Sequence, residues 1–216
     1  MVEQNVRGSA LLPVMLLMFL FSAVVLGASA VVRVEITVGE RFRGATEALY
    51  AAEAALASTV AELRALPSWN PVIDGTAHSP SVQGLYAGDH VVPGGGFVRV
   101  CCGSQSAAGH LARDTSLSPL PARRAVQWRP FLWTTEAALL PGASASRRFL
   151  LVWVADDEGD GDGVAGVDAN GIVLVRAEAV EPGGLRRAVE VYVQRPIDGF
   201  PPPGPVVSVF GWREVR

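Results

Sequence analysis

Residues 9–32, SALLPVMLLMFLFSAVVLGASAVV, form an uncharged and mostly apolar stretch close to the start of the chain. As an α-helix this stretch would rise about 36 Å, enough to cross a hydrocarbon core of about 30 Å. The sequence therefore predicts one membrane-spanning helix. A cleaved secretory signal is the alternative, because Ala28-Ser29-Ala30 suits signal peptidase. The apolar region of such a signal is usually shorter, about 7 to 15 residues.

A second helical pattern follows the apolar stretch. In residues 45–66, ATEALYAAEAALASTVAELRAL, apolar side chains recur at steps of three and four: Leu49, Ala52, Leu56, Val60, Leu63 and Leu66. Pro67 ends the pattern, while Gly39 and Gly44 can be accommodated inside a helix. We therefore expect one nearly continuous helix from Pro13, as its first helical residue, to Leu66. Its first half is apolar all round and its second half is amphipathic.

The rest of the chain is predicted to form a loop-rich antiparallel sheet. Residues 67–123 are rich in proline and glycine, with one short strand expected at 97–102. Longer strands are predicted at 125–134, 148–155, 171–179 and 187–195, and the turn EPGGL, residues 181–185, joins the last two as a hairpin. The proline-rich residues 196–216 are expected to be an extended tail or an edge strand, docked by Trp212. The expected fold class is α+β, with the sheet covering the apolar stripe of the long helix.

Charge and composition exclude some functions. The net charge is -3, and all 18 basic residues are arginines without a basic stripe, so nucleic acid is not an expected partner. Adjacent Cys101 and Cys102 are interpreted as a small apolar pair, with a vicinal or intermolecular bridge left open. The histidines lack metal-ligand spacing and no catalytic triad pattern is present, so we expect no enzyme.

One segment concentrates oxygen ligands. Residues 155–171, ADDEGDGDGVAGVDANG, contain the candidate metal ligands Asp156, Glu158, Asp160, Asp162, Asp168 and Asn170. The first three resemble the start of a calcium loop, but its twelfth position is Val167, which cannot supply a bidentate carboxylate. A site would therefore need Asp168 and Asn170 in another geometry. A solvated acidic loop is the alternative, and calcium is the only cofactor that the sequence suggests.

The N-terminal region resembles a type IV pilin. Arg7-Gly8 before Ser9 is similar to the junction cut by a prepilin peptidase, which implies removal of residues 1–8 and a methylated N-terminus at Ser9. Residues 50–59, YAAEAALAST, resemble the Ala-Ala-Glu-Ala-Ala-Leu element of PilX-type minor pilins. Major pilins carry Glu at the fifth mature position, which is Pro13 here. PilX-type minor pilins and the tip pseudopilin of type II secretion tend to lack this Glu as well.

This resemblance implies an organisation into a prepilin leader (1–8), a transmembrane and filament-core helix (9–32), an amphipathic helix (33–66), a sheet domain (67–195) and a tail (196–216). It implies a type IV pilin-like fold. It also implies a minor pilin that primes pilus assembly at or near the filament tip. The implied partners are other minor pilins, the major pilin, a PilY-type tip protein and prepilin peptidase.

The implied location is the inner membrane, with a single pass and a periplasmic C-terminal domain, and the cell-surface pilus after assembly. Two alternatives stay open: a tip pseudopilin of a type II secretion system, and a signal-anchored exported binding domain. The pattern leaves open whether adhesion, motility or DNA uptake is served.

Overall fold

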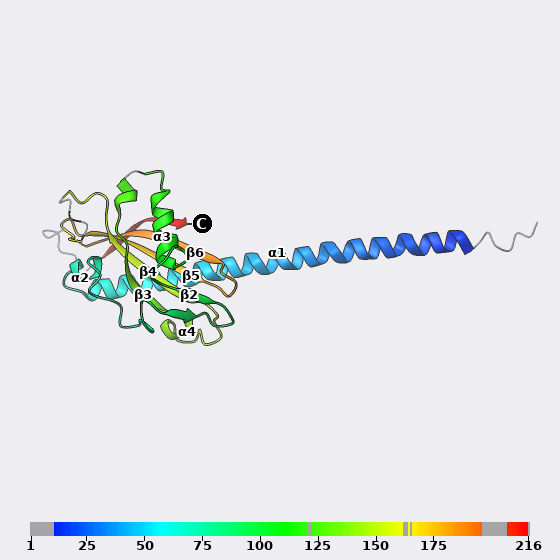
Figure 1. Cartoon of the computed structure of the whole chain (residues 1–216), viewed down its shortest axis with the longest axis horizontal. Coiled ribbons are helices and arrows are strands. Elements are labelled where there is room, and N and C mark those ends of the chain that lie inside the picture. The colour runs from blue at the N-terminus through cyan, green and yellow to red at the C-terminus, as the bar shows by residue number, and fades with distance from the viewer. Residues whose placement is uncertain (1–10, 121, 162–163, 165, 196–206, 216) are drawn as a thin grey trace, which may run out of the picture. The chain divides into compact units, whose positions relative to one another are not determined.

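The computed structural model describes residues 11–120, 122–161, 164, 166–195 and 207–215. Its elements are the helices α1 (Leu11–Ala65), α2 (Asn70–Ile73), α3 (Ala107–Ser116) and α4 (Glu136–Leu139), the 3-10 helix η2 (Ala122–Ala125), and the strands β1 (Asp89–Val91), β2 (Phe97–Arg99), β3 (Arg129–Thr135), β4 (Phe149–Asp156), β5 (Ile172–Val180), β6 (Arg186–Gln194) and β7 (Ser208–Val215) (Figure 1). The chain divides into two compact units, and the division falls within α1, between Gly44 and Ala45.

The first unit contains the apolar part of α1. The prediction of one continuous helix is confirmed, and every described residue from Leu11 to Arg43 is exposed. By length and composition α1 can cross a membrane. The described helix already includes Leu11, so Pro13 is not its first residue as predicted. Proline is tolerated in the first turn, because an N–H there has no acceptor within the helix.

The second unit is built on a five-stranded antiparallel sheet of order β3-β4-β5-β6-β7. The remaining part of α1 packs on one face of this sheet, which we call the inner face. The predicted apolar stripe is confirmed: Ala52, Leu56, Val60 and Leu63 are buried, and Leu49 and Leu66 pack against the same core. The predicted α+β class with an antiparallel sheet is therefore confirmed.

Successive side chains of a strand point to opposite faces of the sheet, and here both faces are buried. On β4, Leu150, Val152 and Val154 belong to the inner core with α1, whereas Leu151 and Trp153 belong to a second, outer core. Leu111 of α3 and Val98 of the β1–β2 hairpin also belong to the outer core. Helix α3, which the sequence analysis did not predict, therefore helps to cover the outer face.

The short strand predicted at 97–102 ends at Arg99, so both cysteines lie beyond it. Cys101 and Cys102 are bonded to each other in a disulfide, which corrects the prediction of an unbridged apolar pair. Cys101 is 7% exposed, whereas Cys102 is exposed and has φ of +73°. The bridge therefore lies at the surface of the outer core, in the connection from β2 to α3.

The C-terminal segment is an edge strand, one of the two predicted alternatives. β7 pairs with β6, and the register shifts between Glu190 and Tyr192. Opposite this shift is Gly211, with φ of +64°, where an added Cβ would lie 2.8 Å from the Tyr192 ring. The predicted docking role of Trp212 is wrong, because this side chain is 51% exposed. Residues 196–206 and 216 of the predicted tail lie outside the described residues.

Candidate functional site

The acidic loop between β4 and β5 brings three predicted metal ligands together. Asp156, Asp160 and Asp168 each offer a carboxylate oxygen, and these oxygens lie within 4.8 Å of one another. Two oxygens bound to one calcium ion at about 2.4 Å can be at most about 4.8 Å apart. The three carboxylates are therefore close enough to share a cation.

The other predicted ligands are engaged elsewhere. Glu158 accepts a hydrogen bond from the Tyr192 hydroxyl at 2.6 Å. Asn170 Nδ2 donates to Asp157 Oδ1, and Asn170 Oδ1 accepts from the Ile172 N–H. Asp162 lies outside the described residues. The arrangement thus differs from a linear calcium loop, since it joins the two ends of the segment.

Backbone contacts position Asp160 and Asp168. Asp160 Oδ2 accepts from the Ala169 N–H at 2.7 Å, and Asp168 Oδ1 accepts from the Gly171 N–H at 2.7 Å. The Asp168 N–H donates to Asn70 Oδ1 of α2 at 3.0 Å. Asp168 is therefore anchored to α2, and backbone N–H groups hold the carboxylates of Asp160 and Asp168 in place.

Burial raises the pKa of two carboxyl groups of this cluster, Asp156 and Asp168. Asp156 is 7% exposed, and burial, followed by the negative charges of Asp160 and Asp157, raises its pKa to about 7. Burial also raises the pKa of Asp168, and the Gly171 N–H partly offsets this effect. A divalent cation would favour the ionised forms, so cation binding and proton release are coupled here.

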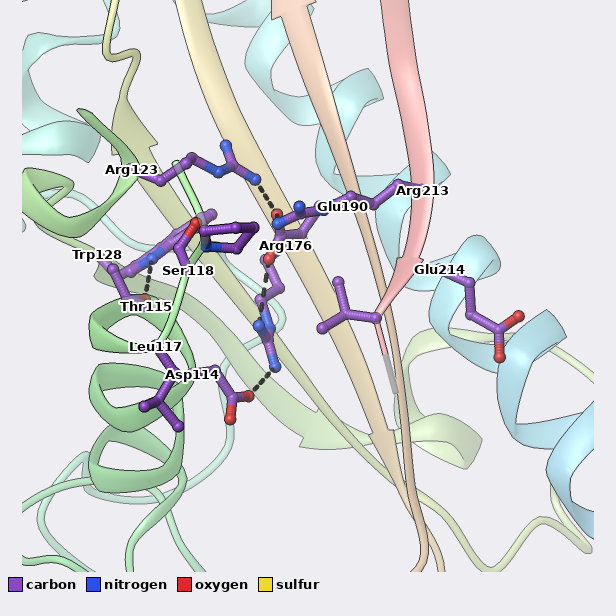
Figure 2. Close-up of a pocket in the computed structure, with 12 residues that line it drawn as sticks. Asp114, Thr115, Leu117, Ser118, Arg123, Trp128, Arg176, Glu190, Arg213 and Glu214 are labelled. Atoms are coloured by element: carbon purple, nitrogen blue, oxygen red, sulfur yellow. Dashed lines mark hydrogen bonds and ion pairs between the residues drawn. The ribbon is translucent and has the colours of Figure 1, made fainter. Parts of the chain in front are cut away.

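A separate pocket of about 330 Å³ lies on the outer face. Figure 2 shows it between α3 and β7, above β5 and β6. Its floor is charged, with Arg176 and Glu190, and its walls include Trp128, Leu117 and Arg213. The sequence analysis did not identify this pocket.

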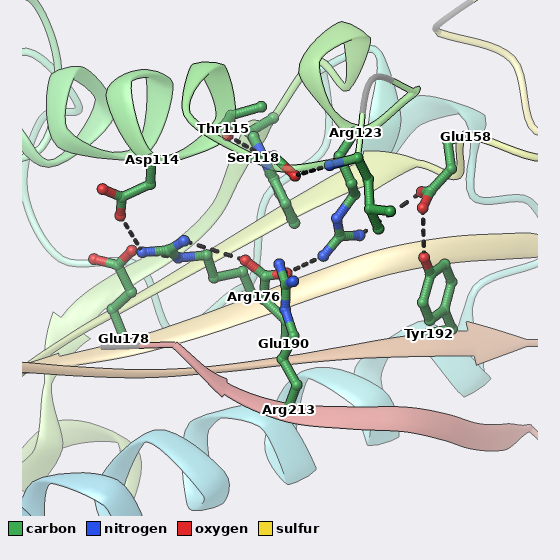
Figure 3. Close-up of polar contacts among 12 residues, drawn as sticks. Asp114, Thr115, Ser118, Arg123, Glu158, Arg176, Glu178, Glu190, Tyr192 and Arg213 are labelled. Carbon is green, nitrogen blue, oxygen red and sulfur yellow. Dashed lines mark hydrogen bonds and ion pairs between the residues drawn. The ribbon is translucent and has the colours of Figure 1, made fainter.

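The charges at its floor form an extended network (Figure 3). Arg176 donates to Glu178 at 2.6 Å, to Glu190 at 3.1 Å and to Asp114 of α3 at 2.9 Å. Glu190 also accepts from Arg123 and from Arg213. Buried charges are costly unless they are paired, and here each buried arginine has carboxylate partners. The network therefore connects α3 and η2 to strands β5, β6 and β7 of the sheet.

Next to the network, Tyr192 has a pKa raised to about 12, first by burial and then by its bond to Glu158. Glu158 also lies near Arg123, which is 6% exposed. Part of this network could have been inferred from the sequence, because Arg176 and Glu178 are two residues apart on a predicted strand and must share a face. The partners from α3 and η2 could not.

The N-terminal candidates are only partly described. Arg7, Gly8 and Ser9 lie outside the described residues. Pro13 is exposed within the apolar part of α1. The predicted processing site therefore has no described geometry, and its assignment depends on the sequence alone.

Comparisons of the chain with protein-family models, with curated proteins and with solved structures found no match.

Proposed function

We propose that this chain is a PilX-type minor pilin, a single-pass inner-membrane precursor that becomes a subunit at or near the tip of a type IV pilus. One observation carries the proposal: a single helix has an exposed apolar half and a half that is buried against an antiparallel sheet. The first half suits a hydrocarbon environment, and the second half is an integral part of a folded domain. A helix of this kind is retained with its domain rather than discarded.

The exposed half needs an apolar environment. From Leu11 to Val32 its large side chains are mostly more than half exposed, and Phe19 is 72% exposed. Contact of so much apolar surface with water is unfavourable, so lipid or similar helices must cover it. Ala23, Gly27 and Ala30 provide small side chains at which such helices can approach closely. Lipid would cover this apolar surface in the membrane precursor, and the helices of neighbouring subunits would cover it in the filament core.

Pro13 supports a position at the tip. In a major pilin the Glu expected here compensates the free amine of a neighbouring subunit. A carboxylate within an apolar helix bundle is costly without a partner. A subunit with no neighbour above it is more stable without this carboxylate. The chain is therefore better suited to starting a filament than to serving as its repeating subunit.

Processing tests this proposal directly. The full-length chain should be expressed in bacterial membranes with and without a prepilin peptidase, and the product weighed by intact mass spectrometry. We expect loss of residues 1–8 only when the peptidase is present, together with methylation of Ser9. The matched control Gly8→Val should remain uncut. Cleavage after Ala30 in both samples would instead identify an exported domain with an ordinary signal.

A type II secretion tip pseudopilin would be processed in the same way, so a second experiment is needed. Deletion of the protein from its own host should abolish or reduce surface pili while leaving the export of secreted enzymes intact. The opposite pattern would assign the chain to a secretion pseudopilus.

A further inference from the structure

The disulfide between Cys101 and Cys102 lies between two anchors to α3. Immediately before it, the carbonyl of buried Val100 accepts from the Ala108 N–H at 3.0 Å. Immediately after it, the carbonyl of Gly103 accepts from the N–H and the hydroxyl of Ser106. The conformation of the two cysteines is therefore coupled to the first turn of α3.

This contact is also sterically close. Gly109 of α3 faces the backbone after the bridge, so that an added Cβ would lie 2.2 Å from the Gly103 oxygen and 2.9 Å from Ser104 Cα. Ser106 caps α3 by accepting from the Gly109 N–H at 3.0 Å. A shift of the 101–104 backbone would disturb both the cap and this contact.

The backbone of Cys102 favours such a shift once the bridge opens. Cys102 is the only residue other than glycine with positive φ in the part of the chain that the structure describes. A side chain with a Cβ disfavours this region, unless the surrounding structure imposes it. The covalent ring of the bridge restricts Cys102, and its opening removes that restriction.

We propose that Cys101 and Cys102 form a reversible thiol–disulfide exchange site that controls the packing of the α3 N-terminus. Cys102 is exposed and Cys101 is 7% exposed, so an incoming thiolate reaches Cys102 Sγ first. A bond forms between the two sulfurs, the bond to Cys101 Sγ breaks, and Cys101 leaves as a thiolate that takes a proton from water. A second thiol attacks the sulfur of the first, which releases Cys102 and leaves the two thiols oxidised to a disulfide.

Opening or closing of the bridge then affects the outer face of the sheet through the contacts of α3. Helix α3 carries Asp114, which accepts from Arg176 at 2.9 Å, and Thr115, which accepts from Trp128 Nε1 at 3.0 Å. Both residues line the outer pocket. The inference is independent of pilus assembly and holds for an exported domain as well.

The experiment uses the full chain in detergent micelles, titrated with dithiothreitol. Alkylation with N-ethylmaleimide and intact mass should give no adduct before reduction and two adducts after it. Hydrogen exchange of residues 107–111 should become about tenfold faster on reduction, the scale expected when a residue with a Cβ leaves positive φ. Exchange in β5 and β6 should stay unchanged. Two adducts before reduction, or unchanged exchange at 107–111, would overturn the proposal.

Two variants separate the bridge from the backbone of Cys102. Cys102→Ser cannot form the bridge and retains a Cβ, so its exchange at 107–111 should be fast with or without dithiothreitol. Cys102→Gly also lacks the bridge but tolerates positive φ, so its exchange should stay close to that of the oxidised chain. Equal exchange in the two variants would exclude coupling through this residue.

Discussion

Arg176 on β5 donates from Nη1 to Glu190 Oε1, at 3.1 Å, directly opposite on β6. Both side chains are at least nine-tenths buried, and Glu190 also accepts from Arg123 and Arg213. Three guanidinium groups thus share one carboxylate on the outer face of the sheet. This shared carboxylate connects the central strands with η2 and β7.

Glu190→Ala should strongly destabilise the domain. It leaves two buried guanidinium groups short of a partner, and breaking a buried ion pair in this way costs about 3 to 5 kcal/mol. Arg213→Ala removes only the 46% exposed member and should cost about 1 kcal/mol or less. Urea unfolding of the full chain in micelles, followed by tryptophan fluorescence, measures both values. Equal losses of unfolding free energy in the two variants would show that burial does not determine how much each ion pair stabilises the domain.

The raised pKa of Asp156 predicts greater stability in mild acid. Its folded pKa of about 7 exceeds the ordinary value of 3.8, so between these pH values the folded state binds more protons than the unfolded state. The free energy of unfolding should therefore fall as pH rises from 5 to 8, by at most about 3 kcal/mol from this group. Asp156→Asn should remove most of this slope, and thermal melting across that range checks it. A slope that persists in the variant would assign the effect to other groups.

Calcium should stabilise the domain at pH 7.5 and much less at pH 5. With a dissociation constant of about 0.1 mM, 1 mM calcium adds about 1.4 kcal/mol to the free energy of unfolding. Protonation of Asp156 competes with the cation at low pH. Asp160→Asn should abolish the calcium-dependent rise in melting temperature, and the Ala169 N–H can still donate to its amide oxygen. A rise of the same size in this variant and the wild type would exclude the site, and magnesium serves as the control ion.

Gly109→Ala should loosen α3. The added Cβ would meet the Gly103 carbonyl and Ser104 Cα, which are backbone atoms and cannot rotate away. The cost of such overpacking is about 1 to 3 kcal/mol. Gly39→Ala is the matched control, because its Cβ would meet nothing within 4 Å on a helix. Hydrogen exchange of residues 107–116 measures the effect, and unchanged protection would contradict the close contact.

The main elements of the fold could be predicted because their patterns are periodic and long. The strands predicted at 148–155 and 171–179 match β4 and β5 within one residue at each end. Both segments are rich in valine and are followed by turn residues, which favours strands over helices. Helix α3 was missed because Gly109 and His110 interrupt a short segment. The Ser106 N-cap before two alanines was nevertheless a usable signal.

The sites were harder to predict because they depend on contacts between distant segments. The sequence predicts that a calcium site would need Asp168 and Asn170 besides Asp156, Glu158 and Asp160, and the structure brings only Asp156, Asp160 and Asp168 together. Glu158 instead bonds to Tyr192 on β6. Arg123 is next to Arg124 in the sequence, yet it is buried and forms an ion pair with Glu190 of β6. Composition alone does not reveal such pairing.

The exposed side chain of Trp212 gives strand β7 a solvent-accessible fluorophore. Of the five tryptophans, Trp69, Trp133 and Trp153 are at most 3% exposed, whereas Trp212 is 51% exposed. A collisional quencher in solution therefore reaches the indole of Trp212 most readily and half-buried Trp128 to a smaller extent, while the three buried indoles are protected. Detachment of the C-terminal strand from its neighbour would change the accessible fraction of the emission before the rest of the domain unfolds.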